Sequence, residues 1–403
     1  MVQRRKPDGE GGFAPRSPLA AGRPAPAAKR RAVLVLGMHR SGTSAVAGVV
    51  RALGAAPPKT PMGPHRDNPR GYFESQALFI AHDEMLSAAG TRWDDCRPID
   101  RHWFRSTAAQ QYHRKIRAIF IEEFGDEPLI LVKDPRICRF MPFTEAILAE
   151  LGISGVAVLP IRNPLEVAYS LQRRDGFGPA KSFLVWLRHV LDAELYSRHL
   201  PRYFLAYEDF LADWRHHVDR IADVAGVAQP AWADRSAAEI DGFLSVELRR
   251  ERATLGDLDI HPASAQLIRD AYRIFTDIAA GGESTELLER LDAVRTQFDK
   301  DCDAFGAALA EQEAARERAV AERDALAADG NKLAGERDAF AAERDRLAAA
   351  RDALAADRDK MTAERDALAR QHASLKAAHA GVLGSRTWRL TAPLRSLTRL
   401  LRR

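Results

Sequence analysis

A short loop near residue 40 has the residue types of an anion-binding site. An apolar run that starts at residue 32 ends at Gly37, and residues 37–44 read GMHRSGTS. Gly37 and Gly42 have the spacing of the phosphate loop GxxxxGK[ST], but Thr43 stands where that loop has its phosphate-contacting lysine. What the loop offers is backbone amides, hydroxyls and a guanidinium at the start of a predicted helix, where the helix dipole favours negative charge. The sequence predicts a phosphate-like or sulfate-like ligand here, held by Arg40, Ser41, Gly42, Thr43 and Ser44.

A second candidate anion site follows another apolar run. Residues 161–171 read IRNPLEVAYSL, in which Arg162 ends the run and Ser170 lies eight residues later, two turns into a predicted helix. Arginine presents a planar fork of donors that suits a phosphate group, and the serine adds a hydroxyl. Alone, such a pair is more often a helix cap beside a solvated arginine. Its place after the first anion loop favours a second anion site.

The elements that must position these residues alternate along the chain. Short apolar runs predict strands at 32–37, 128–133, 155–161 and 202–206, and helical patterns are expected at 42–53, 75–89, 106–123, 139–151 and 164–174. Residues 179–298 read as mostly helical. Continuous apolar strands separated by helices indicate an α/β fold, a three-layer sandwich around a central parallel sheet. Ligands of such sheets bind beyond the carboxyl ends of the strands.

Composition divides the chain into four predicted parts. Residues 1–30 read as a disordered basic leader, 31–300 as the α/β domain, 303–381 as a long heptad helix and 382–403 as a basic amphipathic tail. The net charge of +4 comes from the two ends and gives no reason to expect a nucleic-acid partner. The three scattered cysteines and the lack of a secretory pattern favour a cytoplasmic protein, whose tail contacts the inner membrane surface, docks on a protein partner or stays a soluble tail.

The predicted long helix has a seven-residue apolar repeat. The repeat consists of Leu326, Leu333, Phe340, Leu347, Leu354, Met361, Leu368 and Leu375. If these residues take the d positions of a heptad, Arg337, Arg344, Arg351, Arg358 and Arg365 fall at a, so half of the seam is charged. The pattern therefore leaves two hypotheses open: a coiled coil that makes a homo-oligomer, and a solvated single helix or flexible spacer.

With these motifs in place, residues 32–300 resemble the sulfotransferases that use 3′-phosphoadenosine 5′-phosphosulfate (PAPS). GMHRSGTS is similar to the family's 5′-phosphosulfate loop, and IRNPLEVAYSL to its 3′-phosphate motif, with Arg162 and Ser170 in the binding positions. LVKDPR resembles the strand end that places a lysine, here Lys133, near the transferring group, and AYEDFL the segment whose tyrosine, here Tyr207, contacts adenine. The resemblance implies sulfuryl transfer without a metal. The RKG element of the cytosolic members has no clear counterpart, with Arg249 and Arg250 as possible stand-ins.

The resemblance leaves the catalytic base open. The histidine-bearing KTH of cytosolic members is replaced by KDP, so the chain is closer to the bacterial and tyrosylprotein-type members, which use a carboxylate. Glu74, near the position of their base, is the favoured candidate, Asp134, beside Lys133, is its rival, and a base other than these two is the third alternative. Either residue also has a plain structural interpretation, Glu74 as a charge at a helix start and Asp134 as a turn cap. Arg40 and Lys133 are expected to stabilise charge during transfer.

The sequence thus favours an enzyme that moves a sulfuryl group from PAPS to an acceptor hydroxyl, on a glycan or another surface-associated molecule. Two other classes of function stay open. One is a phosphate-loop phosphotransferase that uses ATP, which the missing lysine disfavours. The other is a catalytically silent scaffold carried by the oligomerising helix.

Overall fold

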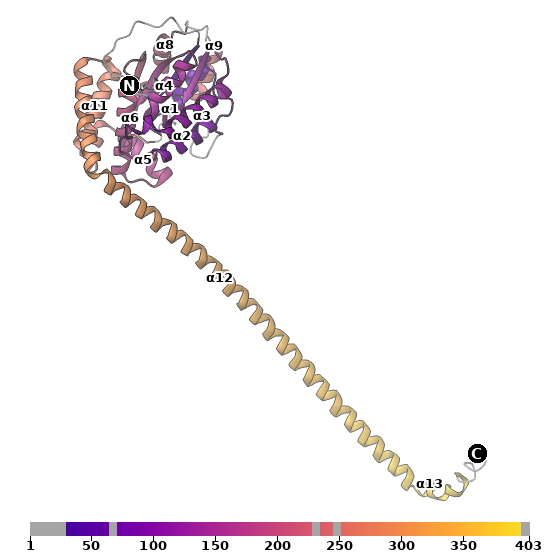
Figure 1. Ribbon diagram of the computed structural model, residues 1–403. Coiled ribbons are helices and arrows are strands. Elements are labelled where there is room, and N and C mark those ends of the chain that lie inside the picture. Colours follow the sequence, from indigo (N-terminus) through magenta and orange to yellow (C-terminus); the bar gives the residue numbers. More distant parts are fainter. Residues whose placement is uncertain (1–29, 64–70, 228–233, 245–250, 396–403) are drawn as a thin grey trace, which may run out of the picture. The chain divides into compact units, whose positions relative to one another are not determined.

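A computed structural model of the protein describes residues 30–63, 71–227, 234–244 and 251–395 (Figure 1). The chain divides into two compact units, residues 1–311 and residues 312–403. The first unit contains the sheet and both predicted anion motifs.

Four parallel strands form the sheet. They are β1 (Arg30–Val35), β2 (Leu129–Lys133), β3 (Ile153–Ile161) and β4 (Arg202–Ala206), in the order β2-β1-β3-β4. In the register of the sheet Val35 lies opposite both Lys133 and Val158, so β1 and β2 end together at one edge. The predicted α/β fold with a central parallel sheet is confirmed, and all four strands lie where the apolar runs placed them.

Helices cover both faces of the sheet (Figure 1). The face that carries Val33 and Val35 of β1 packs against α1 (Thr43–Ala52), α7 (Tyr207–Ala212), α8 (Trp214–Ala225) and α9 (Asp234–Phe243). The opposite face packs against α2 (Gln76–Ala88), α3 (Thr107–Phe124), α4 (Ile137–Glu150), α5 (Pro164–Asp175), α6 (Pro179–Ser197) and α11 (Gln266–Gly281). The short helices η1 (Trp103–Arg105) and α10 (Leu255–Ile260) complete the unit. This is a three-layer sandwich, because successive strand residues point to opposite faces.

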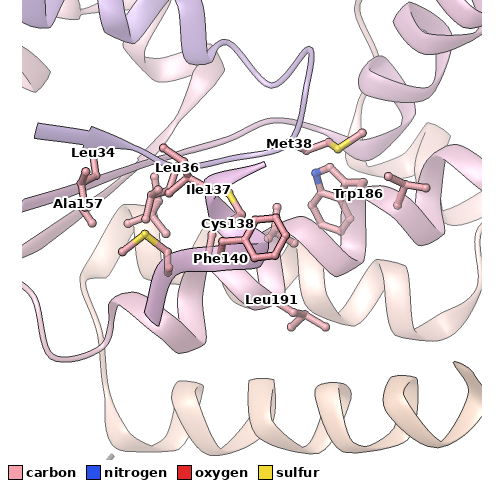
Figure 2. Close-up of a cluster of buried hydrophobic side chains, with 14 of the residues drawn as sticks. Leu34, Leu36, Met38, Ile137, Cys138, Phe140, Ala157, Trp186 and Leu191 are labelled. Carbon is pink, nitrogen blue, oxygen red and sulfur yellow. The ribbon is translucent and has the colours of Figure 1, made fainter. Parts of the chain in front are cut away.

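The larger core lies between the sheet and α4 and α6 (Figure 2). Leu34 and Leu36 come from β1 and the residue just after it, Phe140 from α4 and Trp186 from α6, and each is at most 1% exposed. Figure 2 shows Met38, from the loop after β1, next to the ring of Trp186. The anion loop is therefore anchored in the core at its first residues.

The strand order makes a topological switch point at the carboxyl ends of β1 and β3. The chain leaves β1 toward β2 on one side, and leaves β3 toward β4 on the other. In parallel sheets ligands bind at such a switch point, because the two connecting segments diverge there. The loops that follow β1 and β3 begin at residues 36 and 162, so they carry the two predicted anion motifs.

The long helix α12 (Thr285–Gly384) begins within the first unit, earlier than the heptad repeat suggests. Its first turns bury Leu291, Val294, Phe298 and Cys302, so they form part of the domain core. A buried charge cluster ties these turns to α6: the carboxylate of Glu194, which is 0% exposed, pairs with the guanidinium of Arg295 at 3.1 Å. Arg198 and Arg202 pair with the same carboxylate at 2.7 and 3.2 Å.

Replacing Glu194 by Ala is expected to lower the free energy of unfolding of the first unit by about 3–5 kcal/mol. Removing the carboxylate leaves three arginines without their shared buried partner, which costs far more than loss of an exposed pair. The matched control is Glu84→Ala, which breaks an exposed pair with Lys115 and should cost at most about 1 kcal/mol. Urea unfolding followed by tryptophan fluorescence measures both variants, and equal small losses would contradict the expectation.

The second unit contains the rest of α12 and α13 (Arg386–Leu390). Gly330 and Gly335 lie inside the helix and do not interrupt it. The eight apolar residues of the heptad repeat are each 60–77% exposed. Among the described residues, no helix is both long and apolar enough to cross a membrane. Residues 1–29 of the predicted leader and residues 396–403 of the basic tail lie outside the described residues, and Arg30 already belongs to β1.

Candidate active site

The anion loop has an unusual backbone, which explains part of its sequence. Gly42 has φ 89°, in the left-handed region, and immediately precedes α1, and Arg40 has φ 69°. Within the loop the Ser41 amide donates to the Met38 carbonyl at 3.2 Å. Ser41 is 0% exposed, and its hydroxyl has no hydrogen-bond partner among the described residues. A buried hydroxyl without a protein partner at a helix start suits an anionic ligand, because burying the hydroxyl unpaired costs free energy.

A glycine is needed at position 42 for its backbone conformation and also because there is no room for a side chain. A Cβ at this position would lie 2.2 Å from Cδ2 of Tyr207, which directly follows β4. The Tyr207 ring also lies under Arg162, with the guanidinium carbon 4.9 Å from the ring centroid. Tyr207 is 4% exposed, and its ring is packed next to both anion motifs. Its expected contact with adenine stays a prediction.

Replacing Gly42 by Ala is expected to weaken anion binding and to destabilise the domain. Left-handed backbone costs an L residue roughly 1–2 kcal/mol, and here the new Cβ also displaces Tyr207. Gly54→Ala is a matched control, because Gly54 has φ 95° and a Cβ added there would meet no heavy atom within 4 Å. Thermal unfolding with and without a 3′-phosphorylated nucleotide compares them. Both variants should lose stability, and only Gly42→Ala should also lose the ligand-induced rise in Tm.

The two predicted anion motifs meet through direct hydrogen bonds. The Arg40 Nε donates to the Ser170 hydroxyl at 2.7 Å, although 130 residues separate them in sequence. In the other direction, Nη1 of Arg162 donates to the Arg40 carbonyl at 2.9 Å. Arg40, Arg162 and Ser170 therefore form one cluster beyond the carboxyl ends of β1 and β3. The structure brings together the residues that sequence reasoning assigned to two separate phosphate groups.

Two residues that sequence reasoning missed complete this cluster. Glu166, which is 1% exposed, accepts from the Arg162 Nε at 2.8 Å and from the Ala253 amide at 3.1 Å. The Asn163 side chain caps α5 through the Leu165 amide at 2.9 Å and donates to the Ala253 carbonyl at 3.0 Å. The signal for both was present in the motif, since an Asn before Pro and an acid in the first turn are typical of a helix start. Arg249 and Arg250 lie outside the described residues.

A buried ion pair lies at the neighbouring strand end. Lys133, the last residue of β2, hydrogen-bonds Glu74, which precedes the Ser75 cap of α2, and the two side chains are 2% and 4% exposed. Burial and the nearby charge of Asp134 raise the pKa of the Glu74 carboxyl, and the Lys133 ammonium only partly offsets this rise. A carboxylate with a raised pKa beside a strong cation is equipped to accept a proton.

Asp134 has a different environment from Glu74. Its carboxylate pairs with the His82 Nδ1 at 2.8 Å, with the Arg136 amide at 3.0 Å and with the Arg136 Nη1 at 3.1 Å. Burial alone raises the pKa of this carboxyl, but the Arg136 charge and the His82 hydrogen bond outweigh it, so its pKa is lowered far below the ordinary value. A carboxylate this well paired is a weak proton acceptor. Arg136 continues the network to Asp83 at 2.6 Å.

His39, inside the anion loop, has an aromatic environment. Its ring packs edge-on against Trp93, with centroids 4.6 Å apart, and lies 6.5 Å from the ring of His189. Burial and the positive charge of Arg174 lower the pKa of His39 well below its ordinary value. The imidazole is therefore neutral at physiological pH and helps to anchor the loop on α6.

The described residues contain no group of three or more His, Cys, Asp or Glu side chains placed to hold a metal ion. The site consists of Arg40, Ser41, Gly42, Thr43, Ser44, Arg162 and Ser170, with Tyr207 beneath them and the Lys133–Glu74 pair at the end of β2. Thr43 is buried at the first position of α1, and Ser44 follows it. Chemically, such a site can bind a dianion and move a proton.

Comparison with known proteins gives a likeness to solved structures only. No protein-family model matches the chain, and no curated protein matches it. Three of the similar solved structures are sulfotransferases. The sulfotransferase domain of the Synechococcus PCC 7002 olefin synthase has 16% identity and a TM-score of 0.32, over 66% of this chain and 94% of that domain.

The other two are comparably distant. The sulfotransferase domain of the curacin biosynthetic pathway has 13% identity and a TM-score of 0.33, over 66% of this chain and 97% of that domain. Sulfotransferase STF1 from Mycobacterium tuberculosis H37Rv has 14% identity and a TM-score of 0.34, over 62% of this chain and 77% of STF1. At these identities and TM-scores, the likeness does not transfer a function to this chain.

Proposed function

We propose that the protein is a sulfotransferase that moves the sulfuryl group of PAPS to a hydroxyl of its acceptor. The observation that carries the proposal is the junction of two anion motifs, in which Arg40 and Ser170 share a hydrogen bond and Arg162 holds the Arg40 carbonyl. One nucleotide with anionic groups at both its 5′ and its 3′ positions would account for two such motifs side by side. A nucleoside triphosphate has phosphate groups at its 5′ position alone, so it needs only the first anion motif.

The donor residues take separate parts in this proposal. The loop amides and the hydroxyls of Ser41, Thr43 and Ser44 receive the 5′-phosphosulfate at the start of α1. Arg162 and Ser170 receive the 3′-phosphate. Both residues already make hydrogen bonds, Arg162 with Glu166 and Ser170 with Arg40. Arg162 keeps the buried Glu166 carboxylate and offers further donors of its planar fork to the phosphate, which takes the place of the contact between Ser170 and Arg40.

Transfer then needs positioning and charge stabilisation. An acceptor oxygen attacks sulfur in line with the bridging oxygen, the new O–S bond forms, and the bond to the leaving phosphate oxygen breaks. Arg40 and Lys133 stabilise the negative charge that builds up on the transferring and leaving oxygens. Glu74 accepts the proton of the acceptor hydroxyl. Its raised pKa favours it over Asp134, whose carboxylate is held by His82 and Arg136.

A labelled donor tests the reaction itself. With ³⁵S-labelled PAPS and a panel of hydroxyl-bearing acceptors that includes polysaccharides and simple phenols, we expect label to move onto at least one acceptor class. With γ-³²P-labelled ATP, no transfer is expected, because Thr43 replaces the lysine that ATP-dependent phosphate loops use. Transfer from ATP but not from PAPS would replace this proposal by the phosphotransferase. Transfer from neither would favour the scaffold.

The acceptor and the cellular location are proposed more broadly. A glycan or another surface-associated acceptor suits a chain whose last segment is basic, because residues 386–395 carry Arg386, Arg389 and Arg395 beside Trp388. Such a segment can lie on an anionic membrane surface. We therefore place the enzyme in the cytoplasm, at the inner face of the membrane, without a nucleic-acid partner.

A further inference from the structure

The second unit presents a continuous apolar stripe that its own chain does not cover. The leucine stripe comprises the residues Leu326, Leu333, Phe340, Leu347, Leu354, Met361, Leu368 and Leu375. Each of them is 60–77% exposed, and they repeat every seven residues along one helix. Isolated exposed leucines need no explanation, but an aligned row of this length marks an interaction surface.

The positions next to the stripe indicate what covers it. With the stripe at d, arginines occupy a at Arg323, Arg337, Arg344, Arg351, Arg358 and Arg365, and alanines occupy nearly every e. Five of these six arginines directly follow an acidic residue at g, namely Glu322, Glu336, Glu343, Asp357 and Glu364. A chain with cations at a and anions at g carries both halves of a charge pair, so it is complementary to a second copy of itself.

The positions of the g residues distinguish a parallel pair of helices from an antiparallel pair. In a parallel, in-register pair, a residue at a packs against the g residue that precedes it on the partner helix, so Arg344 of one copy meets Glu343 of the other. In an antiparallel pair the two g rows face each other, and the acids repel. The parallel pair also stacks each apolar d residue on its own copy, leucine on leucine in six of the eight layers, with small alanines at e allowing close approach. Arginine then faces arginine across the a layers, and the partner's acids at g offset that repulsion.

The arginines can leave the aspartates that they now contact and pair with the acids of a second copy. Each of the six now pairs with the aspartate next to it in sequence, for example Arg337 with Asp338 at 2.7 Å and Arg344 with Asp345 at 2.7 Å. In these six pairs the arginines are 72–76% exposed and the aspartates 48–69% exposed, and exposed pairs of this kind contribute little stability. Their aliphatic stems can cover the seam while the guanidinium groups reach the partner's carboxylates.

We propose that residues 322–375 of two copies form a parallel, in-register coiled coil, in which arginines at a pair with the partner's acids at g. The leucine stripe supplies the attraction, and the charged a layers specify two strands and their alignment, as polar a residues do elsewhere. This inference goes beyond sulfuryl transfer and does not depend on it, since the catalytic residues all lie in the first unit.

Light scattering on the full chain tests the number of copies. The wild type should have twice the chain mass of 44.6 kDa, and the double variant Leu347→Asp, Leu354→Asp should have the mass of one chain. The double variant should retain the donor binding of the wild type, because its substitutions lie outside the first unit. A monomeric wild type, or an assembly of three or more chains, would overturn the proposal.

Single cysteines test the orientation. Leu333→Cys and Leu368→Cys lie near opposite ends of the stripe, and in a parallel pair each should form a disulfide with its own copy under mild oxidation. Ala349→Cys, at position f on the far side of the helix, is the matched control, and it should not cross-link. Cross-linking that appears only when the Leu333→Cys and Leu368→Cys chains are mixed would establish an antiparallel pair and overturn the proposal.

Charge reversal tests the proposed pairs. Glu336→Lys with Glu343→Lys places cations at g against the arginines at a, and should weaken the dimer at least tenfold in dissociation constant. Asp338→Lys with Asp345→Lys makes the same charge change at position b, which lies away from the seam, and should weaken the dimer far less. Equal effects of the two double variants would contradict the pairing of a with g.

Discussion

The variant Glu74→Gln is expected to lose about 10²–10⁴-fold in kcat while it retains donor binding. General-base catalysis by a positioned carboxylate contributes a factor of this size. The amide keeps the shape of the side chain and a hydrogen bond to Lys133, but it cannot accept the acceptor's proton. Initial-rate kinetics with PAPS give kcat, and calorimetry with the product nucleotide 3′-phosphoadenosine 5′-phosphate (PAP) gives the dissociation constant.

Controls separate a catalytic from a structural role for Glu74. Glu84→Gln, on the exposed face of α2, should leave kcat unchanged. Because the pKa of Glu74 is raised, wild-type activity should fall on the acid side at a higher pH than an ordinary glutamate produces, and this acid limb should be missing from the residual activity of Glu74→Gln. Full activity in Glu74→Gln would reject Glu74 as the base.

Replacing Arg162 by Ala should weaken PAP binding by about 10- to 100-fold and leave ADP binding nearly unchanged. A charge-assisted hydrogen bond contributes about 1.5–3 kcal/mol, and ADP lacks the 3′-phosphate that Arg162 is proposed to hold. Arg162→Lys should fall between the two, because it keeps the charge and loses the planar fork. Calorimetric titration of each variant with each nucleotide measures the ratio.

The ratio of PAP to ADP affinity is the informative quantity. Arg162 also holds the Arg40 carbonyl and pairs with Glu166, so a loss of structure in the variant would weaken both nucleotides alike. Arg173→Ala is the matched control, since Arg173 lies on the same helix and its side chain is 52% exposed. An unchanged ratio in Arg162→Ala would remove this residue from the 3′-phosphate site.

Sequence patterns could predict the sheet because its strands are buried on both faces. Four apolar runs, each followed by polar residues, fixed the positions of β1 to β4, and Pro164 marked the start of α5. The start of α12 could not be predicted from the heptad repeat, because the residues of its first turns pack into the domain core and do not show the repeat. Arg295 shows this: it lies in the long helix α12 and contacts Glu194 in the domain core.

The two motifs of the candidate site could be picked out from the sequence, but the side-chain contacts between them could not. The residue types around Arg40 and Arg162 mark two candidate anion motifs, but nothing local says that Arg40 reaches Ser170. The sequence already favoured Glu74 over Asp134, and the structure adds the physical difference between them, because their pKa values depend on what surrounds them. His82 illustrates the limit: it has no ligand spacing in the sequence, yet it pairs with Asp134 across 52 residues.

The measurement that tests the central claim most directly is calorimetric titration of the wild-type chain with PAP, ADP and ATP under the same conditions. We predict selective binding of PAP, because two adjoining anion motifs match a nucleotide with phosphate groups at both its 5′ and its 3′ positions. Equal binding of PAP and ADP, or preference for ATP, would contradict the sulfotransferase proposal and favour a phosphotransferase. Binding of none of the three would leave the chain as a scaffold built around its long helix.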